Sequence, residues 1–442
     1  MDKTYVNVMG AGLAGCEAAY QIAQRGINVK LYEMKPKKFS PAHHNNNFAE
    51  LVCSNSLRSD DISNAIGLLK GELRELDSLI MKAADASKVP AGSALAVDRE
   101  KFSEYITNVI KNHPNIVVIN EEVTSINMDE ITVIATGPLT SDSFAKFIKQ
   151  HLVGDDLHFY DAVAPIVEFD SIDMTKAFYA SRYDKGDADY INCPMSKQEY
   201  DIFYKELVNA KEAELHDFDK ENQKIKVFEG CMPVEVMAKR GYDTLLFGSL
   251  KPVGLAHPIT KETYYAVVQL RKENNYNSMY NIVGFQTHLT FPEQKRVFSL
   301  IPGLENANFL RYGVMHRNTY INSPKYLDFD YSLKSKNNIF FAGQMTGVEG
   351  YIESTSSGFV AGINAYRRFI GENSVDFTKE TVIGALAHYI NDGAYSANFQ
   401  PMNANFGIVS PLNYKVKGGK KLRNEEIAKR SLQFIRKIKG TF

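Results

Sequence analysis

A glycine-rich turn close to the start of the chain constrains the fold more than any other feature. Gly10, Gly12 and Gly15 have the spacing GxGxxG, and they stand between the strand-like residues 4–9 and the helix-favouring residues 16–26. In such a turn the first glycine permits the tight bend, the second allows a pyrophosphate to approach the backbone, and the third allows close packing of helix on strand. The pattern therefore predicts a dinucleotide-binding unit.

A second strand and an acidic residue complete this unit. Residues 27–32 have a strand pattern, and Glu33 follows them, 18 residues after Gly15. An acid at this place is expected to accept hydrogen bonds from the adenosine ribose, and it argues against NADP. The helix amino terminus is expected to bind the phosphates. The predicted cradle comprises Gly10, Ala11, Gly12, Leu13, Ala14, Gly15 and Glu33.

Two later segments favour FAD over NAD. Residues 133–138 read as a strand that ends in Thr-Gly, and residues 338–343 read as another that ends in glycine. A glycine-rich turn and a helix with small residues on one face, 352–362, follow the second of these strands. Many flavoproteins close their FAD site in this way, although each segment alone could be a plain strand connection. The further cofactor-binding candidates are Thr136, Gly137, Gly343, Gln344, Gly347 and Tyr351.

Strand and helix patterns alternate in the first part of the chain, which is typical of a parallel sheet. The pattern changes in the middle and resumes near residue 338. The middle part contains a Lys/Glu-rich helix pattern over residues 196–223 and a strand pattern with exposed polar residues over residues 264–270. We therefore predict an α/β fold, in which a Rossmann-like FAD-binding domain holds an inserted α+β domain. The expected division is 1–185 and 325–442 for the FAD-binding domain and 186–324 for the insertion.

Composition excludes several classes of protein. The chain is 44% hydrophobic and 23% charged, which is ordinary globular composition. It contains no run of 18 apolar residues and no signal-peptide pattern, so we expect a cytoplasmic protein with no membrane partner. The four cysteines form no CxxC pair, which argues against a disulfide scaffold and against a zinc site, and we expect no metal. Cys16 is expected to pack on the sheet, and Cys193 carries no signal.

Two other cysteines have unusual neighbours. Cys53 is followed by polar, turn-prone residues and by Arg58, five positions on. Cys231 lies between Gly230 and Pro233, a setting that favours a turn and can expose a thiol. A nearby cation would raise the thiolate fraction of either cysteine. A small buried side chain with no reactivity is the simpler alternative for each.

Seven segments, in order along nearly the whole chain, resemble the folate- and FAD-dependent tRNA uracil-C5 methyltransferase family, TrmFO. The two cysteine segments and the Gly-Gln turn are specific to that family. The wider GidA-type tRNA wobble-modification flavoproteins share the turns but lack this pair of cysteines. The segments are GAGLAGCEAA, ELVCSNSLRSD, DREKFSEYI, FEGCMPVEVMA, MHRNTYINSP, FAGQMTGVEGYIES and NFQPMNANFG.

The resemblance implies a chemistry for these residues. 5,10-Methylenetetrahydrofolate would donate a one-carbon unit, reduced flavin would carry it through N5, and NADH or NADPH would supply the electrons. The resemblance assigns Cys53 and Cys231 to catalysis: a thiolate adds to uracil C6 so that C5 can attack carbon, and a base then removes the C5 proton. We favour Cys231 as the nucleophile and Cys53 as the group that protects the methylene or assists proton transfer. Tyr351 is expected beside the flavin, where it could stack on folate, FAD or the base, with core packing as the alternative.

The carboxyl-terminal residues suggest an RNA partner. Residues 415–442 contain ten Lys and Arg against Glu425 and Glu426, a net charge of +8. Together with Arg311 and Arg317 they are candidates for the phosphate contacts that hold RNA while a uridine is flipped out. A solvated basic helix face is the alternative.

The expected product is 5-methyluridine, with position 54 of the tRNA T-loop as the expected target. The same chemistry on a uridine of 23S ribosomal RNA stays open, because the cofactor and catalytic motifs do not name the RNA. Three less favoured hypotheses are a GidA-like wobble-modification flavoprotein, a small-molecule flavin oxidoreductase and a flavin-containing RNA assembly factor. The oligomeric state is left open.

Overall fold

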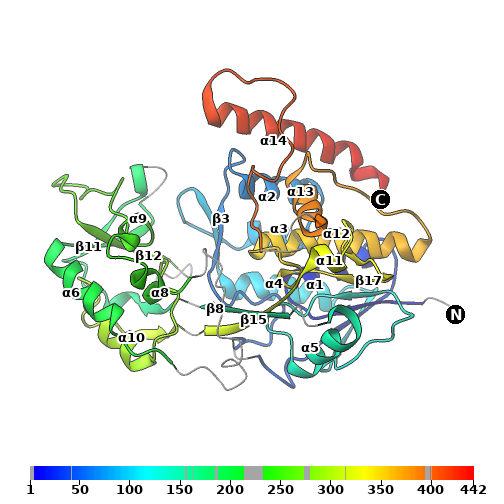
Figure 1. The fold of residues 1–442 in the computed structure, drawn as a ribbon, viewed down its shortest axis with the longest axis horizontal. Coiled ribbons are helices and arrows are strands. Elements are labelled where there is room, and N and C mark those ends of the chain that lie inside the picture. Colours follow the sequence, from blue (N-terminus) through cyan, green and yellow to red (C-terminus); the bar gives the residue numbers. More distant parts are fainter. Residues whose placement is uncertain are drawn as a thin grey trace.

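The computed structural model of the chain contains two lobes, each built around its own sheet and hydrophobic core (Figure 1). The larger core draws residues from both ends of the chain, and the smaller core draws them from the middle. The residues described are 4–40, 42–154, 157–162, 164–184, 188–213, 232–272, 279–313, 315–393, 399 and 401–442.

The larger lobe is built on a parallel sheet with the strand order of a dinucleotide-binding fold. β1 is buried along its whole length and lies inside the sheet, as expected for an apolar strand covered on both faces. The order places β7 beside β1, so the strand order reverses direction between these two strands. In open α/β sheets, ligands bind at this point, outside the carboxyl ends of the strands. The predicted Rossmann-like class is confirmed. The order is β16 (Ser332–Leu333), β17 (Lys336–Phe341), β7 (Thr132–Ile134), β1 (Val6–Met9), β2 (Val29–Glu33) and β6 (Ile116–Asn120), with only the edge strand β16 antiparallel.

Helices α1 (Leu13–Ala23) and α12 (Tyr351–Ile370) pack against each other and against the sheet. The two helices can approach closely because Gly358 has no side chain. A Cβ at this position would lie only 2.3 Å from the Ala14 carbonyl oxygen. The small-residue face expected over 352–362 is therefore an α1 contact. The other helices of this lobe are α2 (Ala65–Glu75), α3 (Leu79–Ala86), α4 (Arg99–Lys111), α5 (Asp142–Ile148), α11 (Ser323–Tyr326), α13 (Val382–Asn391) and α14 (Gly419–Ile438).

The second lobe holds an antiparallel sheet and short helices, and Figure 1 shows it to one side of the first. The Lys/Glu-rich helix expected from residue 196 is α6 (Lys197–Val208), which begins with a capping box formed by Ser196 and Glu199. Its sheet has the order β10 (Phe178–Tyr179), β11 (Tyr190–Met195), β12 (Ala266–Lys272), β13 (Met279–Ile282), β9 (Ile166–Glu168) and β14 (Phe309–Arg311). The remaining helices are α8 (Val234–Lys239), α9 (Thr244–Phe247) and α10 (Phe291–Phe298).

One strand of this lobe differs from expectation. Residues 264–270 were expected to form a strand with exposed polar side chains, whereas β12 has mostly buried residues, Val267 and Val268 among them. The physical reason is its place inside the sheet, between β11 and β13, with apolar side chains on both faces. The expected domain boundaries near residues 185 and 325 stay a prediction.

Two smaller sheets lie beside the main ones. β8 (Leu157–Ala162) pairs with β15 (Met315–Ile321) between the lobes, and Figure 1 shows this ribbon at the junction. β3 (Ser56–Ser59), β5 (Ala94–Val97) and β4 (Lys88–Val89) form the other. Within the described part of the chain, no helix has the length and apolar character needed to cross a bilayer.

Candidate cofactor and catalytic site

The turn after β1 has a geometry that two of its glycines make possible. Gly10 has a φ of +97°, and a Cβ there would lie 2.7 Å from the carbonyl oxygen of Ala135. A Cβ at Gly15 would lie 1.8 Å from the carbonyl oxygen of Gly10. Any side chain at either position would force β1, β7 and α1 apart. The roles that the spacing predicted for these two glycines agree with the contacts.

Gly12 lies in a different environment. It is exposed, and a Cβ there would have no atom within 4 Å. It also precedes the first turn of α1, whose N–H groups have no acceptor within the helix and form the positive end of the helix dipole. The turn thus combines open space with backbone donors, which fits a diphosphate.

Glu33 ends β2 and turns its carboxylate toward this turn. One oxygen accepts a hydrogen bond from Ala11 N at 2.9 Å, and the other accepts one from Lys35 N at 3.0 Å. The side chain is buried. Its carboxylate is therefore held in place by the protein, and each oxygen keeps a second lone pair for a ligand hydroxyl.

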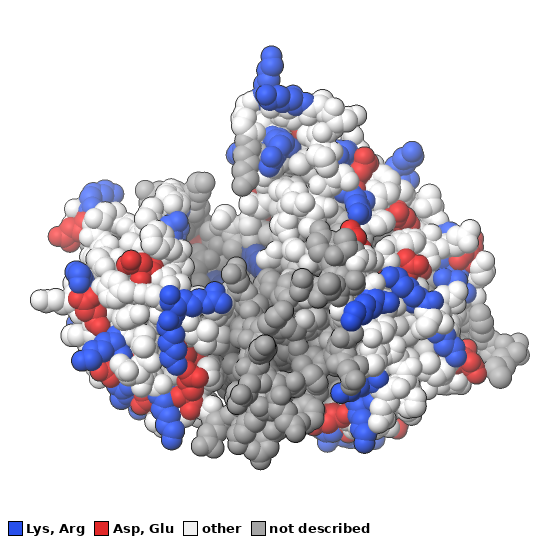
Figure 2. Space-filling model, viewed as in Figure 1, with Lys and Arg blue, Asp and Glu red and all other residues white. Residues whose placement is uncertain are grey.

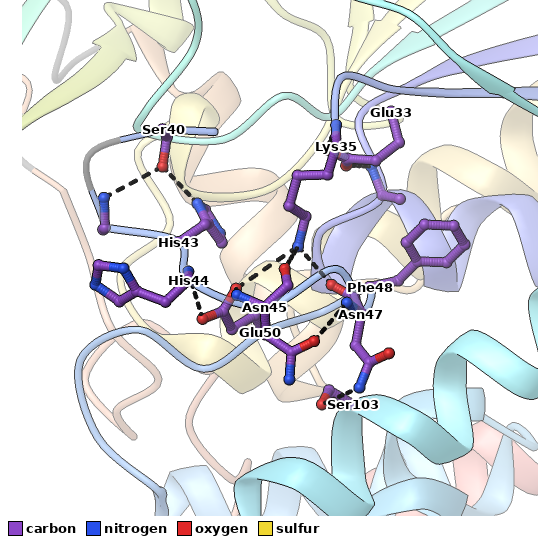
Figure 3. Close-up of polar contacts among 12 residues, drawn as sticks. Glu33, Lys35, Ser40, His43, His44, Asn45, Asn47, Phe48, Glu50 and Ser103 are labelled. Carbon is purple, nitrogen blue, oxygen red and sulfur yellow. Dashed lines mark hydrogen bonds and ion pairs between the residues drawn. The ribbon is translucent and has the colours of Figure 1, made fainter. Parts of the chain in front are cut away.

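The polar loop after Glu33 is organised by the buried side chain of Lys35. Its Nζ donates to the carbonyl oxygens of Asn45, at 3.1 Å, and Asn47, and forms an ion pair with Glu50 at 3.6 Å. Figure 3 shows these groups converging on the lysine beside Glu33. The polar loop that includes His43 to Asn47 is therefore attached to Lys35, two residues after the acid that ends β2.

A second cradle follows β17. Gly343 has a φ of +82°, its N–H donates to Ser357 Oγ at 2.7 Å, and a Cβ there would lie 3.3 Å from that of Ala14. Gly347 also has a φ of +82°, and a Cβ there would strike the ring of Phe399 at 2.5 Å. Between them Gln344 donates to both carboxylate oxygens of Glu349, at 2.9 and 3.0 Å, so its side chain stiffens the turn.

The Thr-Gly pair after β7 lies between the two cradles in the sheet order. Thr136 Oγ1 and Thr140 Oγ1 are 2.6 Å apart, and Thr140 Oγ1 donates to the carbonyl oxygen of Gly137 at 2.7 Å. Gly137 has a φ of +72° and open space at its α carbon. The structure therefore brings the ends of β1, β7 and β17 together at one edge, as predicted for a shared ligand site.

The loop that carries Cys53 is hydrogen-bonded to the start of α12. The hydroxyl of Tyr351 accepts hydrogen bonds from the backbone N–H groups of Cys53, at 2.8 Å, and Ser54, at 3.1 Å. The loop and the second cradle are thus joined, because α12 begins directly after that cradle. Burial raises the pKa of Tyr351 well above its ordinary value, so its hydroxyl stays protonated. The side chain is half-buried and its ring packs against the large core.

Two arginines also hold this loop. Arg99, at the start of α4, donates to the carbonyl oxygens of Leu51 and, at 3.3 Å, Cys53. Arg271, at the end of β12 in the second lobe, donates to Ser54 Oγ and, at 3.2 Å, to Asn55 Oδ1. Neither arginine was predicted as a site residue from the sequence, although Arg99 belongs to the segment DREKFSEYI.

The cation expected beside Cys53 has another partner. Arg58 is exposed and forms an ion pair at 3.2 Å with Glu353, which is buried near the start of α12. Cys16 is fully buried in α1, as expected, and Cys193 is fully buried in the second core. Cys231 lies outside the described residues, and the chain is described again from Met232, just before α8.

The basic carboxyl-terminal segment forms α14. Arg430 donates to the carbonyl oxygens of Ser410 and Pro411, and Arg436 forms an ion pair with Glu75 at 2.6 Å, so part of the positive charge holds the helix on α2 and its neighbours. Figure 2 shows Lys and Arg gathered over the ridge that α14 forms in Figure 1. Among the described side chains of residues 415–442, the exposed cations are Lys415, Lys417, Lys421, Arg423, Lys429, Arg436, Lys437 and Lys439. Arg311 and Arg317 lie in β14 and β15, and their side chains are outside the description.

This fold and this site define a dinucleotide-binding protein of the Rossmann type. A second lobe lies beside the parallel sheet, and its Arg271 contacts the loop that carries Cys53. Residues 5–373 match the family described as glucose inhibited division protein A. The chain therefore belongs to the GidA family, and within it to the TrmFO proteins, to which it is similar over its whole length. The resemblance seen in the sequence is confirmed.

Two relatives support this membership, and one solved structure supports the fold. The TrmFO protein of Acetivibrio thermocellus, named methylenetetrahydrofolate–tRNA-(uracil-5-)-methyltransferase, is 63% identical over 98% of each chain. The Bacillus subtilis protein of the same name is 58% identical over 100% of each chain. Among solved structures, Aquifex aeolicus GidA aligns with a TM-score of 0.70 at 18% identity, covering 99% of this chain and 74% of that one, which supports the fold.

Proposed function

We propose that this protein is a methylenetetrahydrofolate-dependent tRNA uracil-C5 methyltransferase that binds FAD. Relatives at 57–63% identity have that activity in their names. The observation that carries the proposal is the pair of hydrogen bonds from Cys53 N and Ser54 N to the hydroxyl of Tyr351. They attach a loop with a candidate catalytic thiol to the helix that starts at the cofactor cradle.

The residues present fit FAD. The turn from Gly10 to Gly15 would hold the diphosphate, because Gly12 leaves open space in front of free backbone donors. Glu33 would accept hydrogen bonds from the hydroxyls of the adenosine ribose. When bound, FAD would supply redox chemistry and a carrier position for the one-carbon unit. The other residues proposed to line it are Thr136, Gly137, Gly343, Gln344, Gly347 and Tyr351.

The two cysteines would carry out the chemistry on uracil. The Cys231 thiolate would add to C6 and form an S–C bond, while the C5–C6 π electrons move to give an enolate. C5 would then form a bond to the one-carbon electrophile while the carbon–nitrogen π pair of that electrophile moves to the nitrogen. The remaining carbon–nitrogen bond would break when the carbon is reduced to a methyl group. A base would remove the C5 proton, the electron pair would restore the C5–C6 double bond, and the S–C bond would break to return the thiolate. Cys53 would assist this proton transfer or protect the one-carbon unit.

Reduction of the one-carbon unit to a methyl group needs two electrons, and we propose NADH or NADPH as their source. Position 54 of the tRNA T-loop is the proposed target. The exposed cations of α14 would contact RNA phosphates, and this binding would weaken as salt rises. A 23S ribosomal RNA substrate would use the same residues, so the test must compare the two RNAs.

The test is methyl transfer by the purified protein with methylenetetrahydrofolate, NADH and either unmodified tRNA or 23S rRNA fragments, with nucleoside mass spectrometry as the readout. We expect 5-methyluridine in tRNA, complete loss in Cys231→Ala and Cys53→Ala, and retention in Cys193→Ala, the matched control in the second core. Methylation of the rRNA alone would refute the tRNA assignment. NADH oxidation without methylation of either RNA would favour a small-molecule oxidoreductase.

A further inference from the structure

Ala49 joins the loop before Cys53 to the glycine-rich turn. Its N–H donates to the carbonyl oxygen of Ala11 at 2.9 Å, and the N–H of Ala11 donates to Glu33 Oε2, also at 2.9 Å. Ala49 is buried and has a φ of +50°, in a region that residues other than glycine seldom occupy. A strained residue of this kind keeps its conformation only where surrounding contacts fix it. The loop is therefore held against the turn at this residue.

Lys35 holds the amino-terminal side of the same loop. Its buried Nζ donates to the carbonyl oxygens of Asn45, at 3.1 Å, and Asn47, and it lies 3.6 Å from a carboxylate oxygen of Glu50. That carboxylate in turn accepts hydrogen bonds from His44 N at 3.0 Å and from Asn45 N at 3.2 Å. Figure 3 shows the lysine ammonium among these groups. One side chain thus gathers the backbone that leads to Ala49.

The other end of the loop reaches the candidate catalytic thiol. Arg99, at the start of α4, donates to the carbonyl oxygens of Leu51 and, at 3.3 Å, Cys53. The N–H of Cys53 donates to the hydroxyl of Tyr351 at 2.8 Å. Ala49 and Cys53 are four positions apart, so their Cα atoms lie within about 14 Å of each other. A displacement of Ala49 must therefore be taken up within a short segment that ends at Cys53.

The turn end of the loop coincides with the groups that fit a dinucleotide. The backbone of Ala11 belongs to the turn proposed to hold the diphosphate, and each oxygen of Glu33 keeps a lone pair for a ribose hydroxyl. A ligand that contacts both groups would restrict the atoms to which Ala49 is attached. Two events that stabilise the same arrangement of shared atoms favour each other, and such coupling is reciprocal. Occupancy of the turn should therefore favour the attached loop.

We propose that residues 45–53 form a strap that couples occupancy of the dinucleotide turn to the position of Cys53, and that Lys35 is the positioning residue that holds this strap on the turn. The identity of the ligand as FAD and the role of the thiol rest on the proposed function above. The coupling does not, because it can be measured without RNA or folate and with a ligand that contains no flavin.

The experiment measures hydrogen exchange at the Cys53 amide in the full-length protein prepared without bound flavin, with and without saturating ADP. ADP has the adenosine ribose and the diphosphate, so it can occupy the turn, but it has no flavin that could cover Cys53. We expect ADP to slow this exchange about tenfold, a coupling of ordinary size. In Lys35→Met the effect of ADP should fall below twofold. If Lys35 served only to stabilise the fold, exchange would become faster to the same extent with and without ADP, and the effect of ADP would persist.

Three further measurements make the result decisive. Lys38→Met is the matched control, because it removes an exposed ion pair with Glu122 at 2.7 Å, and it should keep the full effect of ADP. Glu50→Gln changes a more exposed partner of Lys35, so it should fold even if Lys35→Met does not, and it should also reduce the effect of ADP. Because the coupling is reciprocal, Lys35→Met should raise the dissociation constant of FAD about tenfold.

The outcomes separate the strap from the proposed function. Failure of ADP to bind, exchange at Cys53 that does not respond to bound ADP, or an undiminished response in both Lys35→Met and Glu50→Gln would overturn the strap. Methylation of RNA by a protein that gives one of these results would leave the proposed function standing. A normal response to ADP in a protein that methylates neither RNA would refute only the proposed function.

Discussion

Replacing Tyr351 with phenylalanine separates two roles that its side chain could have. The variant keeps the aromatic ring, and with it any stacking on a cofactor or base. It removes the hydroxyl that accepts hydrogen bonds from Cys53 N and Ser54 N. Any effect of the substitution therefore reports the attachment of the cysteine loop to α12.

The magnitude follows from the two donors left without an acceptor. A buried N–H that loses its partner costs about 1–3 kcal/mol. Cys53 and Ser54 are half-buried, so water can partly replace the hydroxyl, and we take about 1 kcal/mol for each. The sum, about 2 kcal/mol, corresponds to a roughly 30-fold larger population of loop conformations detached from α12.

Hydrogen exchange followed by mass spectrometry measures this population at the amides concerned. We expect exchange at Cys53 and Ser54 to be about 30-fold faster in Tyr351→Phe, with kcat for methylation reduced and cofactor content unchanged. Tyr414→Phe is the matched control, because it removes an exposed hydroxyl bonded to Glu426 at 2.9 Å, far from the loop in sequence. Exchange at the two amides that stays within twofold of the unmodified protein would show that the hydroxyl does not hold the loop.

Three other substitutions test the site and the core. Gly15→Ala should prevent correct packing of α1, since its Cβ would overlap a carbonyl oxygen, whereas Gly12→Ala should fold normally and lose cofactor; equal thermal stability of the two variants would contradict this contrast. Arg271→Met removes the hydrogen bonds to Ser54 Oγ and Asn55 Oδ1, and it should lower kcat at least about tenfold without reducing bound cofactor, because a hydrogen bond to a charged group contributes about 1.5–3 kcal/mol; an unchanged kcat would exclude a positioning role. Burial raises the pKa of Glu72 to about 7, from an ordinary value of 4.5, so its ionisation should cost about 3 kcal/mol of stability as pH rises from 4.5 through 7. Glu72→Gln should remove that part of the pH dependence of the thermal midpoint, and an identical slope in both proteins would refute it.

The sequence was sufficient for the cofactor fold because its constraints are local. The turn from Gly10 to Gly15 needs small residues at fixed spacing, and these requirements are met within one strand and one helix. The capping of α4 by Asp98, which accepts from Glu100 N and Lys101 N, is local in the same sense. Such features can be read from a few neighbouring residues.

The support of the Cys53 loop could not be predicted in this way. Tyr351 and Arg271 lie 298 and 217 positions from their partners in the loop, and no periodicity or spacing relates them. Sequence proximity was also misleading, because Arg58 is five positions from Cys53 yet pairs with Glu353 on α12. Contacts of this kind depend on how elements far apart in the sequence pack together and, for Arg271, on how the two lobes meet, which a single sequence does not display.

The way in which the Cys53 loop is held determines what its substitution can show. Tyr351 and Arg99 bind the N–H and the carbonyl oxygen of residue 53, and Arg271 binds its neighbours Ser54 and Asn55. Backbone contacts persist when the side chain is changed, so Cys53→Ala should keep the loop in place. Loss of methylation in that variant, with hydrogen exchange at residues 53 and 54 unchanged, would therefore report the chemistry of the thiol rather than a displaced loop. Faster exchange would show instead that the thiol also supports the loop.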